Sequence, residues 1–84
     1  MFNVKDYEQN SRKYELFKTA KIQAHLFTHN GENDLPADTY VAIKYSHQVW
    51  NHLYKRVEPI YEVTLCDGTF YGHVFANALT SFCL

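Results

Sequence analysis

The fold is decided by residues 61–71, which read YEVTLCDGTFY. Apolar and polar residues alternate from Tyr61 to Leu65, which is the pattern of a β-strand with one buried face. Asp67-Gly68 then supplies a dipeptide that readily adopts the left-handed backbone of a tight hairpin turn. The stretch therefore predicts two antiparallel strands joined by a short turn.

This hairpin extends outward in both directions. We expect its first strand to run from Pro59 to Leu65, because proline is tolerated at the first position of a strand, where its missing N–H lies outside the ladder. The second strand is expected from Thr69 to Phe75, with Gly72 weakening the pairing or marking a bulge.

Two earlier segments show the same two-residue period. It predicts strands at Ala20–Thr28 and Thr39–His47, separated by turn-forming residues 30–38. After the hairpin, residues 76–79 fit a single helical turn and residues 80–83 fit a short closing strand. Five short strands are expected in all.

Two segments lack a strand period. Between Gln48 and Glu58 apolar and charged residues are mixed without a repeat, which predicts a long loop. Residues 3–18 place apolar side chains at spacings that approximate one narrow helical stripe. A helix of this length is marginal in isolation, so the segment is either a helix docked on the rest or a partly ordered arm.

Residues 61–71, followed by Val74 and by Leu79 in the single turn, resemble the SH3-like small β-barrel, and the resemblance covers about residues 18–84. It implies a mainly β, five-stranded barrel in residues 19–84, with residues 1–18 as an N-terminal helical arm. Such barrels bind peptides or nucleic acids, scaffold oligomers and occasionally catalyse reactions, so the architecture does not select a function. The chain lacks the acidic loop and the Trp-Trp pair of the version that binds proline-rich peptides.

Length and composition restrict the class of protein. Eighty-four residues allow one domain, and 46% hydrophobic with 17% aromatic residues argue against intrinsic disorder. Eight Lys/Arg and nine Asp/Glu residues give a net charge of −1, which argues against binding to nucleic acid or membrane by bulk electrostatics. Two cysteines are too few for a disulfide framework, and no signal peptide or membrane span is visible. We expect a cytoplasmic protein.

The reactive side chains give little support for a metal site. His25 and His29 would lie about 13 Å apart on a strand, too far to share a zinc ion. His47 and His52 would converge with Cys66 only if the predicted loop folded back, and no Cys-x-x-Cys motif accompanies them. We expect no metal.

Catalytic patterns are also missing. Ser46-His47 and Cys66-Asp67 are neighbours in sequence, and neighbouring side chains on a strand face opposite ways, so neither is expected to form a nucleophile–base pair. The sequence contains no phosphate-binding loop, dinucleotide fingerprint or Gly-x-Ser-x-Gly motif. We expect no catalysis and no cofactor; an oligomer with a site at its symmetry axis is the open alternative.

Aromatic residues are in surplus, with seven Tyr, six Phe and one Trp. A small barrel cannot bury all of these rings beside its aliphatic residues, so some must lie outside. The candidates are Phe27, Tyr40, Phe70, Trp50 and Tyr54. These rings either pack the N-terminal arm against the barrel or form a binding or self-association surface.

The predicted binding residues are Trp50, His52, Tyr54, Lys55 and Arg56. All of them fall in the predicted loop at residues 48–58, where aromatic and basic side chains are interleaved. Such interleaving suits a protein partner with an acidic rim, and it equally suits the stacked bases of a single-stranded nucleic acid. In the structural alternative, Trp50 folds under the loop as a cap on the barrel.

The sequence therefore predicts a small non-enzymatic interaction module that binds an unidentified protein or self-associates, at least as a dimer, through this aromatic loop. The alternative is a weak single-stranded nucleic-acid-binding module, weak because the loop holds few cations and Glu58 lies close by. A membrane partner is not expected. Small size and the lack of targeting or catalytic motifs suit an accessory protein of a bacterium or a mobile element.

Overall fold

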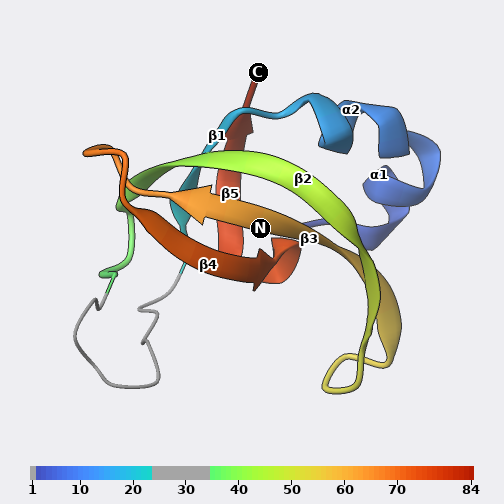
Figure 1. Cartoon of the computed structure of the whole chain (residues 1–84). Coiled ribbons are helices and arrows are strands. Elements are labelled where there is room, and N and C mark those ends of the chain that lie inside the picture. Colours follow the sequence, from blue (N-terminus) through green and yellow to red (C-terminus); the bar gives the residue numbers. More distant parts are fainter. Residues whose placement is uncertain (1, 24–34) are drawn as a thin grey trace.

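A computed structural model describes residues 2–23 and 35–84 of the chain (Figure 1). The elements follow one another as α1 (Val4–Gln9), α2 (Ser11–Leu16), β1 (Thr19–Ile22), β2 (Tyr40–Asn51), β3 (Arg56–Thr64), β4 (Phe70–Phe75), the 3₁₀ turn η1 (Ala76–Ala78) and β5 (Leu79–Cys83). The predicted mainly β fold with helical structure at the N-terminus is confirmed. The arm consists of two short helices rather than one.

The strands form one antiparallel sheet in the order β4-β3-β2-β1-β5. In the described part of the chain β4 and β5 each pair on one side only, so the sheet is open and the expected closure into a barrel is not found. β5 follows β4 after only the turn η1, but it pairs with β1. The outer edge of β4 therefore meets no strand among the described residues.

The predicted Asp-Gly hairpin between β3 and β4 is confirmed. Leu65 N donates to Thr69 O at 2.9 Å, and Gly68 N donates to Leu65 O at 2.9 Å. Gly68 has a φ of 91°, a left-handed backbone that favours glycine. Asp67 Oδ1 accepts a hydrogen bond from Thr69 N at 2.8 Å, so the aspartate side chain also holds the turn.

The prediction of a long loop at residues 48–58 is wrong. β2 and β3 continue through most of this segment and leave only residues 52–55 as a turn. Trp50 pairs with Val57 in the ladder between the two strands. This end of the hairpin carries exposed side chains, and an end that does not cover the core needs no strict alternation of apolar and polar residues. The sequence therefore shows no strand period there.

Bulges interrupt three strands. Ser46 is an extra residue in β2, Tyr71 is an extra residue in β4, and Ser81, with a φ of 55°, lies in the irregular part of β5. The bulge expected near Gly72 is thus confirmed, with a φ of 153° at this glycine. The bulge at Ser46 moves the later side chains of β2 to the opposite face, which hides the two-residue period beyond it.

The remaining strand predictions are confirmed in part. β1 covers residues 20–22 of the predicted strand at residues 20–28, and Gln23 lies outside a strand. Residues 24–28, with His25 and Phe27, lie outside the described residues, as does His29. β2 begins one residue after the predicted start at Thr39. The single helical turn and the closing strand correspond to η1 and β5.

One carboxylate links the two helices. Asn3 caps α1, with its Oδ1 accepting from Asp6 N at 3.2 Å. Asn10 lies between the helices, and its Nδ2 donates to Asp6 Oδ1 at 3.0 Å. Asp6 Oδ2 also accepts from Tyr14 OH, in α2, at 2.7 Å. The arm is therefore a folded helix pair rather than a disordered tail.

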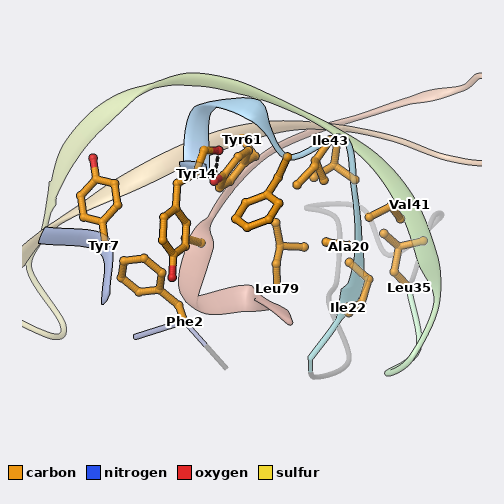
Figure 2. Packing of buried hydrophobic residues seen from close by; sticks show 13 residues of the cluster. Phe2, Tyr7, Tyr14, Ala20, Ile22, Leu35, Val41, Ile43, Tyr61 and Leu79 are labelled. Carbon is orange, nitrogen blue, oxygen red and sulfur yellow. Dashed lines mark hydrogen bonds between the residues drawn. The ribbon is translucent and has the colours of Figure 1, made fainter. Parts of the chain in front are cut away.

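The helices dock on the sheet through an aromatic cluster, which we define as Phe2, Tyr7, Tyr14, Phe17, Tyr61 and Phe82. Figure 2 shows the rings of Phe2, Tyr7, Tyr14 and Tyr61. The Tyr14 ring lies 5.3 Å from the rings of both Tyr7 and Phe17, in edge-to-face contacts. Tyr61 OH donates to Tyr14 O at 2.6 Å and so joins β3 to α2. The rest of the core is mainly aliphatic, with Ala20, Ile22, Val41, Ile43, Val63 and Leu79.

Burial also changes the chemistry of this cluster. It raises the pKa of Tyr61 and of Tyr14 above the ordinary value of a tyrosine hydroxyl, and the bonded Asp6 carboxylate adds to the effect at Tyr14. The pKa of Tyr7 is raised by burial as well. All three hydroxyls therefore remain protonated at neutral pH.

Candidate functional site

The hairpin tip, which we define as residues 50–58, lies at the end of the β2–β3 ribbon away from the β3–β4 turn (Figure 1). All five predicted binding residues lie in it. Trp50 belongs to β2, Arg56 belongs to β3, and the other three form part of the turn between them. The structure thus brings the predicted residues together at one end of the molecule.

A buried asparagine holds the hairpin tip from the inside. Asn51 Oδ1 accepts hydrogen bonds from Leu53 N at 3.0 Å and from Tyr54 N at 3.3 Å. Asn51 Nδ2 donates to Glu58 Oε2 at 2.8 Å. One side chain thus satisfies two backbone N–H groups of the turn and connects them to the neighbouring strand.

Glu58 is fully buried and ties the hairpin tip to the rest of the fold. Its Oε1 accepts from the backbone N of Asn77, in η1, at 3.1 Å. Its Oε2 accepts from Arg56 Nε at 3.3 Å and also receives the bond from Asn51. A buried carboxylate is stable only when donors and a cation compensate it, and Glu58 has both.

The guanidinium of Arg56 is engaged on several sides. Besides its contact with Glu58, it lies 4.9 Å from the ring centre of Tyr54 and 5.8 Å from that of Phe2. Within the hairpin tip, which is described throughout, Lys55 is the cation that remains at the surface. The two predicted rim charges are therefore not equivalent.

The apolar side chains of the hairpin tip stay exposed. Leu53 is 80% exposed, Trp50 50% and Tyr54 47%, and Val57 beside Trp50 is exposed as well. Trp50 is therefore not a buried cap, and its ring makes an edge-to-face contact with His52 at 6.5 Å. Single exposed apolar residues are common, but an adjacent group of them usually marks a contact site.

A mainly apolar groove of about 420 Å³ lies between the hairpin tip and the junction of β4 with η1. It is lined by Asn51, Leu53, Tyr54, Val74, Phe75, Asn77 and Ala78. Sites that accept small ligands measure about 300–1,000 Å³. The groove is therefore large enough to accept an apolar or aromatic side chain of a partner.

Sequence reasoning missed the residues that shape this site. Asn51 could have been found, because asparagine at the start of a turn often accepts from backbone N–H groups two or three residues later. From the sequence, Glu58 is interpreted only as a charge that weakens nucleic-acid binding. Nothing in the sequence places Asn77 beside it, since 19 residues separate the two.

The expectation that Ser46 and His47 face opposite ways is wrong. Ser46 Oγ lies 2.8 Å from His47 Nδ1 at the surface. Ser46 is the bulged residue of β2, and a bulge re-aims side chains so that neighbours can share a side. A catalytic pair also needs a group that orients the base. Among the described residues no carboxylate is bonded to His47.

The other reactive residues do not gather. His52 lies in the hairpin tip, whereas Cys66 lies at the opposite end of β3, where its Sγ is 3.4 Å from Tyr40 O. Hence His47, His52 and Cys66 do not converge. Within residues 2–23 and 35–84, no group of three or more His, Cys, Asp or Glu is placed to hold a metal ion. Cys66 and Cys83 are free, exposed thiols.

Two further members of the aromatic surplus, Tyr40 and Phe70, are exposed far from the hairpin tip. They do not pack the arm, which docks through the aromatic cluster instead.

The helices of the described chain are too short and too polar to cross a membrane. Comparison with protein-family models, curated proteins and solved structures gave no match.

Proposed function

We propose that the protein is a small non-enzymatic interaction module that binds protein through the hairpin tip, either another protein or a second copy of itself. The observation that carries the proposal is the contrast inside the tip. Asn51 and Glu58 are buried and fully bonded, while Leu53, Trp50 and Tyr54 are exposed. Exposed anchors on a fixed backbone lose less conformational entropy when they bind.

The residue types agree with this function. Tryptophan, tyrosine and arginine are enriched where binding energy concentrates, and the hairpin tip contains all three as Trp50, Tyr54 and Arg56. Tyr54 also lines the apolar groove beside the tip. The SH3-like architecture belongs to the same proposal, supported by the 3₁₀ turn before the last strand and by the pairing of that strand with β1. The free thiols support a reducing, cytoplasmic setting.

Single-stranded nucleic acid is the less supported occupant. Nucleic-acid grooves combine stacking rings with several cations that contact phosphates. In the hairpin tip Arg56 already contacts Glu58 and Tyr54, which leaves Lys55 and stacking on Trp50 as the main contributions. Nucleic acid is accordingly an outcome that the experiment below distinguishes.

Site-specific photo-crosslinking in cells tests the function. The photoreactive residue p-benzoylphenylalanine replaces Leu53 at the hairpin tip, and in a control chain it replaces Leu16, which is 64% exposed on α2. We expect a discrete protein adduct from position 53 and none from position 16. Equal adducts from both positions, no adduct, or an adduct with nucleic acid would contradict the proposal.

A further inference from the structure

The chain carries a second exposed aromatic surface at the end of the sheet opposite the hairpin tip. β2 runs from Tyr40 to Asn51 and β3 runs back, so the start of β2 and the β3–β4 turn lie at this other end (Figure 1). The contact between Cys66 Sγ and Tyr40 O joins the two segments. We define the far end as Asp38, Tyr40, Asp67 and Phe70.

Tyr40 and Phe70 lie on the same face of the sheet. Tyr40 is two residues before Ala42, which pairs with Thr64, and Thr64 in turn pairs with Phe70. Residues two apart and residues directly paired across strands share a face. Tyr40 is 60% exposed and Phe70 57%. Two large rings therefore project from one face at the far end.

The two ends carry opposite charge. At the far end Asp38 and Asp67 are exposed, and a bond from Thr69 N holds the pKa of Asp67 below its usual range, so this carboxylate is ionised at neutral pH. Among the described residues, Lys21 Nζ lies over the Tyr40 ring at 4.8 Å, and the His73 ring lies 5.7 Å from that of Phe70, with its Nε2 3.6 Å from Glu62 Oε1. The hairpin tip instead carries Lys55 and Arg56, and its carboxylate, Glu58, is buried against Arg56.

We infer that copies of this chain associate head to tail, with the far end of one copy seated on the hairpin tip of the next. The rings of Tyr40 and Phe70 face the apolar groove beside Leu53 and Tyr54, and the acidic groups of the far end face Lys55. This inference rests on the proposed function and names its partner, a second copy.

Charge decides against the symmetrical alternative. A two-fold contact between two hairpin tips would bring Lys55 of one copy close to Lys55 of the other, and like charges across an interface oppose binding. A head-to-tail contact joins two different surfaces, so it leaves one free surface at each end and repeats into a ring or an open chain. Mass should therefore grow with concentration beyond a dimer.

Complementation between two disabled variants tests this arrangement. The tip variant is Leu53→Glu, which places a carboxylate opposite the acidic far end of the next copy. The far-end variant is Tyr40→Ser/Phe70→Ser, which removes both rings. Leu16→Glu, on exposed α2, is the matched control. Circular dichroism and urea unfolding verify that each variant keeps the fold, since every substituted residue is exposed.

Sedimentation velocity over a concentration series supplies the readout. We expect wild type and Leu16→Glu to grow beyond the 9.9 kDa monomer, and each disabled variant alone to stay monomeric. An equimolar mixture of the two disabled variants should give a particle of twice the monomer mass and no larger, because it retains one intact tip and one intact far end.

Three sedimentation results would overturn the inference: a mixture that stays monomeric, a far-end variant that associates like wild type, or a wild-type chain that stays monomeric at millimolar concentration. None of them decides the proposed function, which the crosslink from position 53 tests separately. An adduct with a different protein, and none between two copies of the chain, supports the function and overturns head-to-tail association. Absence of any protein adduct overturns the function itself.

Discussion

The aromatic cluster and the hairpin tip are built from similar residues, but the chain treats them in opposite ways. Tyr14 and Tyr61 are buried because α1 and α2 bring further rings against the sheet. In the hairpin tip the inner position is taken by Asn51 and Glu58, so the rings of Trp50 and Tyr54 remain at the surface. An aromatic residue is buried and structural, or exposed and available for binding, according to whether other rings or a bonded polar pair fill the space between it and the sheet.

The largest expected effect on stability comes from removing a ring of the buried aromatic cluster. Tyr61→Ala should lower the free energy of unfolding by about 3–5 kcal/mol, because it removes a fully buried ring and leaves Tyr14 O without its donor. Urea unfolding measures the loss. The matched control, Tyr54→Ala at the hairpin tip, should cost less than about 1 kcal/mol. Equal losses in the two variants would contradict the contrast.

The next effect concerns the network that keeps the tip rings outside. Glu58→Ala should cost about 1–3 kcal/mol, because Asn51 and the backbone N of Asn77 lose their buried acceptor. Glu58→Gln keeps the volume and one acceptor oxygen, so it should cost less. The loss should be accompanied by lower fluorescence anisotropy of Trp50, the single tryptophan. Unchanged anisotropy in Glu58→Ala would show that the network does not hold the tip.

A smaller effect on the free energy of unfolding is expected at alkaline pH, and it also comes from the buried aromatic cluster. Tyr14 and Tyr61 hold their protons to higher pH when folded than in the unfolded chain, whose tyrosines titrate near pH 10. The native state then binds more protons than the unfolded state, so the free energy of unfolding is unaffected below about pH 10 and falls as pH rises above it.

Urea midpoints from about pH 9 to about pH 11 measure this slope. Tyr14→Phe should make this slope shallower, because phenylalanine does not titrate and the raised pKa of Tyr14 no longer contributes. A slope as steep in Tyr14→Phe as in wild type would show that this buried hydroxyl is not a source of the pH dependence.

The smallest stability effect is expected at Trp50. Trp50→Ala should change the free energy of unfolding by no more than about 1 kcal/mol, because half of the side chain is already exposed. The same substitution should weaken association strongly and raise the dissociation constant measured by sedimentation by about tenfold or more. A sharp drop in melting temperature with association intact would make Trp50 a structural residue.

Alternation of side chains predicted the strands from Tyr61 outward, whereas the Asp67-Gly68 dipeptide predicted the turn and the isolated Gly72 pointed to a weakened pairing or a bulge. Alternation failed where the ladder contains an extra residue: Ser46 shifts the parity of β2, so the strand continuing to Asn51 looks like a loop. Barrel closure was also misjudged, because local periodicity carries no information on which strands meet at the edges.

Composition alone picked out the predicted binding residues, since Trp50, Tyr54 and Arg56 stand out as residue types, and the structure places them at one end of the molecule. That they bind a partner stays a prediction. The buried residues that hold the hairpin tip in place could not be predicted. Glu58 and Asn77 are distant in sequence, and only the packing of η1 against β3 brings the backbone N of one to the carboxylate of the other. A single sequence therefore indicates the exposed residues of a site more readily than the buried ones that position them.

The bulges at Tyr71 and Ser81 have a consequence for the protein at high concentration. They lie in β4 and β5, the two edges of the sheet in the described chain, where an unbroken row of backbone groups would invite strands from other molecules. An incoming strand finds only short regular stretches, interrupted by the backbone of Gly72 and Ser81. The sheet is thereby protected against amyloid-like growth without a lysine or proline in either edge strand.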